Sequence, residues 1–100
     1  MSENELRIMK LIAGAGESKA LAFEALKCLK TKDIDRAREL LTESHKADVE
    51  AHNIQTEIIT QELNGEASDT MSLLMVHAQD HYMTSLLARD LIEALIEINA

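Results

Sequence analysis

The sequence contains no proline and no tryptophan, and only three glycines occur among its 100 residues. One tyrosine and one phenylalanine supply its aromatic content of 2%. So few turn-forming residues argue against a fold of many short strands, and nothing in the composition interrupts long helices. The single cysteine, Cys28, excludes an internal disulfide framework and is interpreted as a small buried hydrophobic residue. With 46% apolar residues, the sequence predicts one all-α domain over residues 1–100 with an aliphatic core.

Basic residues are also scarce, since ten lysines and arginines stand against eighteen aspartates and glutamates, for a formal net charge of −8. Nucleic-acid binding normally requires a basic surface, so this class of function is excluded. An acidic surface suits a basic protein partner, and it also simply maintains solubility. The acidic N-terminus, MSENELRIMK, lacks a signal-peptide core, and no apolar run reaches membrane-spanning length. The expected compartment is therefore the cytoplasm.

Apolar residues at helical spacing predict a first helix over about residues 3–30 and a second over about residues 33–63. Asp33 is the predicted N-cap of the second helix. The pair Asn64-Gly65 then provides a C-terminal stop. A phosphate-binding loop at "AGAGES" is disfavoured, because the Lys and Ser/Thr ending of such loops is missing. The two glycines of that stretch, Gly14 and Gly16, are therefore interpreted as sites of close helix packing.

A third helix is predicted to be capped by Ser68 or Asp69 and to run to about Asn99. Three long helices with short connections predict an antiparallel up-down-up three-helix bundle. So long and thin a bundle leaves apolar surface exposed, which favours self-association. A polar line on the second helix is interpreted as a solvated face; it consists of Ser44, Asp48, His52 and Gln55.

The third helix is apolar nearly all round, which predicts burial on both sides. If Asp80 is placed at the centre of one face, a broad aliphatic stripe surrounds it, formed by Leu73, Val76, Met83, Leu87, Leu91, Ala94 and Ile98. Two helices of the same chain cannot easily cover both sides, so this face is expected to meet other copies around an axis. Repeated Asp80 carboxylates would then require protonation or a cation, and a hard ion such as magnesium fits oxygen ligands. Alternatively, Asp80 is a lone polar residue that selects one mode of association.

His77 and His81 are four residues apart and share a face of the third helix. This is metal-ligand spacing, but the metalloprotease motif requires glutamate directly after the first histidine, where Ala78 stands here. A second chemistry is nucleophilic, with the neutral imidazole of His77 accepting a phosphoryl group. The residues alone do not decide between a phosphoryl acceptor at His77 and a histidine whose hydrogen bonds are simply satisfied within an interface.

The stretch "VHAQDHYMTSLLARDLIEALIE" resembles the active-site helix of enzyme IIA of bacterial sugar phosphotransferase systems, in the lactose and chitobiose (cellobiose) class. "AHNIQTEIITQELNG" resembles part of the second helix of that family, and "SKALAFEALKCLKTKDIDRARELL" resembles its first hairpin. The resemblance covers nearly the whole chain. Tyr82 stands where a leucine is usual, and Thr-Lys-Asp-Ile replaces a common glycine-aspartate-aromatic turn.

The resemblance implies a homotrimeric nine-helix assembly in which His77 is the phosphorylated nucleophile and Asp80 of each subunit binds an axial Mg²⁺. Gln79 and His81 are expected to help position the phosphoryl group. The group is expected to come from a histidine of the phosphocarrier protein HPr. It then passes to a cysteine of enzyme IIB, which serves a membrane transporter for a β-linked disaccharide of the lactose, cellobiose or chitobiose type. This makes the chain a phosphotransferase component.

Two other classes of function compete with this interpretation. A non-catalytic oligomeric scaffold would use the polar residues of the third helix only to direct association. A histidine phosphotransfer domain of two-component signalling would also present a histidine on a helix. That class forms a four-helix bundle, and the three predicted helices together with the His-Ala-Gln-Asp-His motif argue against it.

Overall fold

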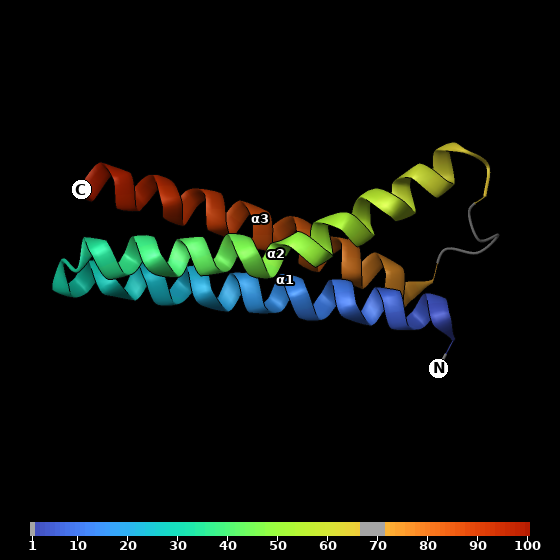
Figure 1. The fold of residues 1–100 in the computed structure, drawn as a ribbon, viewed down its shortest axis with the longest axis horizontal. Helices are drawn as coiled ribbons and strands as arrows, with labels where there is room; N and C mark the ends of the chain where they lie inside the picture. Colours follow the sequence, from blue (N-terminus) through green and yellow to red (C-terminus); the bar gives the residue numbers. More distant parts are fainter. Residues whose placement is uncertain (1, 67–71) are drawn as a thin grey trace.

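The computed structural model describes residues 2–66 and 72–100, and within these ranges the structured elements are all helical. Helix α1 spans Glu3–Cys28, the short 3-10 helix η1 spans Leu29–Thr31, α2 spans Ile34–Leu63 and α3 spans Leu73–Asn99. Figure 1 shows α1 and α3 running in the same direction and α2 running against them. The predicted all-α, up-down-up three-helix fold is confirmed. Its principal extents are 49 × 25 × 19 Å.

The helix ends follow from specific capping residues. Ser2 and Glu5 form a reciprocal capping box at the start of α1. Asp33 caps α2 as predicted, because its carboxylate accepts a hydrogen bond from the backbone nitrogen of Arg36 at 3.1 Å. At the other end of α2, Gly65 adopts a φ of 74°, and the following backbone nitrogen donates to the carbonyl of Gln61. The predicted stop of α2 is therefore also confirmed.

Two predicted boundaries are corrected. Ser72 caps α3, accepting a hydrogen bond from the backbone nitrogen of Met75 at 3.0 Å, so the helix begins later than expected. The predicted caps Ser68 and Asp69 lie outside the described residues. The first α-helix ends at Cys28 rather than Lys30, because the chain tightens into η1 before the turn.

The core consists of two apolar clusters, one of which contains Tyr82, separated by buried polar residues. Buried positions recur at alternating intervals of three and four residues, the spacing of interlocking helices. They are residues 8, 11, 15, 18, 22 and 25 of α1 and residues 78, 82, 85, 89, 92 and 96 of α3. Buried positions of α2 that follow the same pattern include residues 37, 41, 44, 48 and 51. Small residues at many of these positions allow the helix axes to approach closely.

A buried polar layer links all three helices. Arg89 of α3 forms an ion pair with Asp48 of α2 at 3.3 Å, and the side chains are 8% and 12% exposed. The same guanidinium donates to the hydroxyl of Ser18, which lies 2.9 Å from the hydroxyl of Ser44. Ser44 also donates to the backbone carbonyl of Ser18 at 2.7 Å. Most of these polar groups are thus compensated by groups of the other two helices, although Nε of Arg89 is buried without a hydrogen-bond partner among the described residues.

The interpretation of Ser44, Asp48, His52 and Gln55 as one solvated face is therefore wrong. Ser44 and Asp48 are buried, Gln55 is half-buried, and His52 alone of the four is exposed. His52 nevertheless contacts the core, because its Nδ1 lies 2.9 Å from the hydroxyl of Tyr82. Burial, together with the charge of Asp48, raises the pKa of Tyr82, so this phenol stays protonated in its contact with His52.

Candidate functional site

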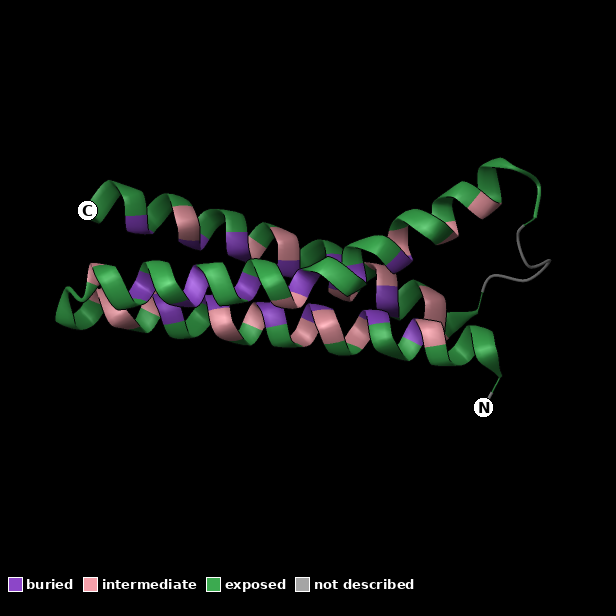
Figure 2. Ribbon diagram, viewed as in Figure 1, coloured by how far each residue is buried: buried purple, intermediate pink, exposed green. Residues whose placement is uncertain are grey.

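The outer face of α3 carries a continuous apolar stripe that the other helices of the chain leave uncovered. Figure 2 shows exposed residues along one side of this helix and buried ones along the other. Large side chains on the exposed side retain 39–84% of their surface; they are Leu73, Val76, Met83, Leu87, Leu91, Leu95 and Ile98. His77 and Asp80 are exposed within this stripe. The prediction that one face of α3 is not covered by the other two helices is confirmed.

The structure brings His77 and His81 together as a parallel pair of imidazole rings. Their centroids are 6.0 Å apart and their planes differ by 9°. The exposed ring of His77 is accessible, whereas His81 is half-buried. A Cβ atom built on Gly16 of α1 would lie 3.3 Å from Nε2 of His81, so His81 packs directly against that helix.

The environment keeps His81 uncharged near neutral pH. Burial is the main cause of its lowered pKa, followed by the positive charge of Lys19 on α1 and by His77. A neutral imidazole has one N–H donor and one acceptor nitrogen. His81 therefore offers one N–H donor beside the exposed ring of His77. This effect of Lys19 was not predicted from the sequence, because nothing in the sequence pattern pairs a lysine of α1 with a histidine of α3.

Gln79 and Asp80 occupy different positions around the same turn of α3. Side chains two residues apart in a helix do not face each other, so Gln79 points away from His77 of its own chain. Asp80 is exposed and lies on the side of the apolar stripe. The hydroxyl of Thr84 donates to the backbone carbonyl of Asp80 at 2.8 Å, which holds the Thr84 side chain against the helix.

One chain alone does not assemble a metal site in the part that the structure describes. Among those residues, no group of three His, Cys, Asp or Glu side chains lies close enough to hold an ion. Asp80 contributes one carboxylate on an uncovered face. Its oxygen atoms are suitable ligands for Mg²⁺, provided that other copies supply the remaining ligands.

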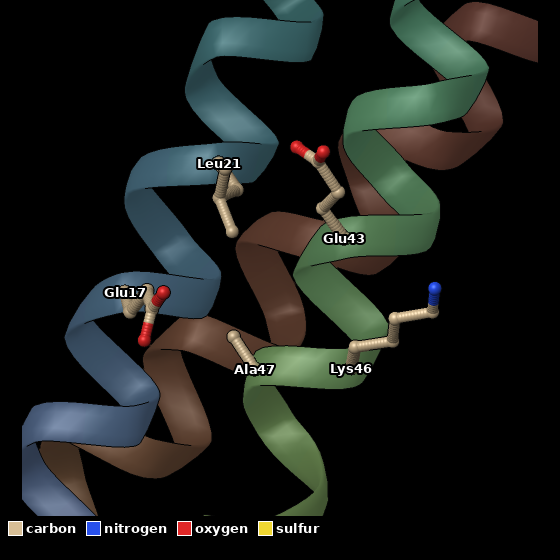
Figure 3. Close-up of a pocket in the computed structure, with 5 residues that line it drawn as sticks. All are labelled: Glu17, Leu21, Glu43, Lys46 and Ala47. Atoms are coloured by element: carbon tan, nitrogen blue, oxygen red, sulfur yellow. The ribbon is translucent and has the colours of Figure 1, made fainter.

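A surface hollow of about 360 Å³ lies elsewhere, between α1 and α2. Figure 3 shows its five lining residues, Glu17, Leu21, Glu43, Lys46 and Ala47. Because α3 contributes none of them, this hollow is separate from the histidine pair.

Within residues 2–66 and 72–100, none of the helices combines the length and apolarity that a membrane crossing requires.

Comparison with known proteins accounts for this arrangement of helices and histidines. Residues 6–100 match the family described as "PTS system, Lactose/Cellobiose specific IIA subunit". The chain belongs to this family. It is thus an enzyme IIA component of the lactose and chitobiose class of sugar phosphotransferase systems, as its resemblance implied.

Individual relatives agree with this assignment. The N,N'-diacetylchitobiose-specific EIIA component of Escherichia coli (strain K12) is 44% identical over 97 residues, covering 97% of this chain and 83% of the relative. The crystal structure of the cellobiose-specific enzyme IIA from Bacillus anthracis superposes with a TM-score of 0.91 at 33% identity, covering 99% of this chain and 90% of that one. Solution structures of the IIA(Chitobiose)-HPr complex of Escherichia coli give a TM-score of 0.77 at 41% identity, covering 99% and 95%. This enzyme IIA chain therefore shares both sequence and fold with phosphotransferase components over nearly its full length.

Proposed function

We propose that this enzyme IIA accepts a phosphoryl group from a histidine of HPr on His77 and passes it to a cysteine of enzyme IIB. The observation that carries the proposal is an exposed imidazole paired with a half-buried, neutral one in a chain of the IIA family. An IIA relative has been solved in complex with HPr, which supports this choice of donor. A relative is specific for N,N'-diacetylchitobiose, which supports a β-linked disaccharide as the transported sugar.

Each transfer exchanges one bond to phosphorus for another. The lone pair of the neutral His77 ring attacks the phosphorus atom while the N–P bond of the donor histidine breaks, and the donor nitrogen keeps that electron pair. In the second transfer, the thiolate of enzyme IIB attacks phosphorus, an S–P bond forms, and His77 recovers its lone pair. Catalysis then consists mainly of in-line positioning and stabilisation of charge on the equatorial oxygens.

The neighbouring side chains fit this demand. His81 donates its N–H to a phosphoryl oxygen, and the charge of Lys19 favours the neutral form of the His81 ring. Gln79 points away from His77 of its own chain, so we assign it to the phosphoryl group on an adjacent copy. The site would then be complete only in the assembled protein.

The uncovered apolar stripe of α3 supports a homotrimer in which three such stripes meet around an axis. Obligate subunit interfaces are rich in apolar surface of this kind. One Asp80 from each copy would hold a single Mg²⁺ on the axis, where the ion would offset the repulsion between the carboxylates. In this arrangement Asp80 has a structural role and does not contact the transferred group.

Phosphohistidine mapping tests the carrier function. Incubation with phosphorylated HPr should give an acid-labile adduct, and His77→Ala should abolish it. His45→Ala is the matched control, because this histidine is also exposed but lies on α2 beside Glu93. Labelling that persists in His77→Ala would place the phosphoryl group on another residue.

Light scattering and metal analysis test the assembly. The wild-type protein should have about three times the 11.1 kDa mass of one chain and should bind one Mg²⁺ per three chains. Asp80→Leu should abolish metal binding yet preserve the trimer, because apolar residues often replace buried charges without loss. A monomeric wild-type protein would refute the trimer.

A further inference from the structure

Two glycines in the middle of α1 face different helices. A Cβ atom on Gly14 would lie 3.1 Å from Cβ of Ala51 and 3.3 Å from the carbonyl oxygen of Ala47, so Gly14 permits close packing against α2. A Cβ atom on Gly16 would meet one group within 4 Å, which is Nε2 of His81 at 3.3 Å. Close packing of helix against helix therefore explains Gly14 and leaves Gly16 unexplained.

Gly16 has a cost that its surroundings must offset. A glycine in a helix interior is less favourable than alanine by about 1 kcal/mol. No positive φ requires glycine here, since Gly65 is the one glycine in the left-handed region within the described chain. The remaining consequence of the missing side chain is the space that the His81 ring uses.

A contact of 3.3 Å between a carbon atom and a ring nitrogen is closer than ordinary van der Waals packing. Any side chain at position 16 would push the His81 ring outward from α1. That ring lies parallel to His77, the proposed phosphoryl acceptor, so the displacement would change the geometry of the pair.

We propose that Gly16 is a positioning residue for phosphoryl transfer, because the absence of its side chain lets His81 lie against α1 at the height and angle that match His77. The inference rests on the proposed function of His77. Gly16 contacts neither the donor nor the phosphoryl group, and it acts entirely through the His81 ring.

The size of the effect follows from the displacement. Alanine at position 16 shifts the ring by a few tenths of an ångström, and the larger Gly16→Val substitution shifts it further. A misplacement of about 1 Å costs about 100-fold in rate. We therefore expect Gly16→Ala to slow transfer by about 2–10-fold and Gly16→Val to slow it by up to about 100-fold.

The decisive experiment is a double-mutant cycle on the rate of transfer from phosphorylated HPr. The full-length protein is compared with Gly16→Ala, His81→Ala and the double variant. Gly16→Ala should slow transfer in the wild-type background and have no effect once His81 is alanine. An equal effect in both backgrounds would show that position 16 acts through the backbone and would overturn the inference, as would full activity in both Gly16→Ala and Gly16→Val.

Gly14→Ala is the matched control, since it introduces the same methyl group two residues earlier against α2. It should lower the midpoint of thermal unfolding, whereas Gly16→Ala should leave the midpoint unchanged or raise it. Wild-type protein that is not phosphorylated on His77 would refute the proposed function itself. A wild-type protein labelled on His77 whose rate is insensitive to both Gly16 substitutions would refute the positioning role alone.

Discussion

The substitution Arg89→Met should be among the most destabilising single changes in the bundle. It removes the guanidinium that pairs with Asp48 and donates to Ser18, and it leaves a carboxylate in a site where the side chain is 12% exposed. Removing one partner of a buried ion pair costs about 3–5 kcal/mol, because the remaining charge keeps its desolvation penalty. A domain of this size has a total stability of about 5–15 kcal/mol, so the loss is a large part of the whole.

Thermal and urea unfolding, followed by circular dichroism at one fixed protein concentration, measure this loss. A change of 3 kcal/mol should lower the unfolding midpoint by at least about 12 °C. The double variant Asp48→Leu/Arg89→Met should recover most of the stability, since it removes both charges together. It also keeps the test informative if Arg89→Met alone does not fold.

Arg38→Met provides the control, because the ion pair of Arg38 with Glu97 lies on the surface, where the two side chains are 50% and 61% exposed. Exposed pairs contribute less than about 1 kcal/mol. If Arg89→Met and Arg38→Met destabilise the protein equally, or if the double variant is no more stable than Arg89→Met, the reasoning about the polar layer is refuted.

Three further predictions concern smaller perturbations. Lys32 has a φ of 58°, so Lys32→Gly should stabilise the protein by up to about 1 kcal/mol in urea unfolding. The relief of backbone strain outweighs the entropy that glycine adds to the unfolded chain. Tyr82→Phe loses the 2.9 Å hydrogen bond to His52 and should cost about 0.5–1.5 kcal/mol in the same assay. Lys19→Gln should raise the pKa of His81 toward its ordinary value of 6.5, which an NMR titration of the imidazole measures. Because the folded-state pKa of His81 is lowered, its contribution to stability is full above pH 6.5 and is lost as pH falls through the window below that value.

Each of these predictions has a discriminating outcome. Lys32→Ala should give no gain, since alanine retains the backbone strain, and an equal gain from alanine and glycine would contradict the φ argument. An unchanged stability in Tyr82→Phe would show that water replaces the phenol without cost. An unchanged His81 titration in Lys19→Gln would show that the ammonium group does not act on that ring.

Much of the fold is predictable from local chemistry. The ends of α2 depend on Asp33 and on the Asn64-Gly65 pair, which act within one turn of their own helix. The uncovered stripe around Asp80 is likewise a property of one helix, visible as an apolar face for which two neighbouring helices leave no partner. Features of this kind require no knowledge of which residues meet across the bundle.

The features that were missed depend on contacts between distant segments. Ser44 and Asp48 resemble a solvated face until Arg89, 41 residues away from Asp48, is placed opposite them. A signal was nevertheless present, because both residues continue the alternating three- and four-residue spacing of Ala37, Leu41 and Ala51. For Gly16, by contrast, nothing in α1 indicates that its neighbour is His81 rather than a packed helix backbone.

The polar layer also fixes the register of α3 against the other helices. A slip of one helical turn, about 5.4 Å, would move Arg89 away from Asp48 and leave both buried charges unpaired. Arg89 is twelve residues from His77, or about 18 Å along the helix. The height of His77 along the bundle is therefore set by an ion pair more than three turns away.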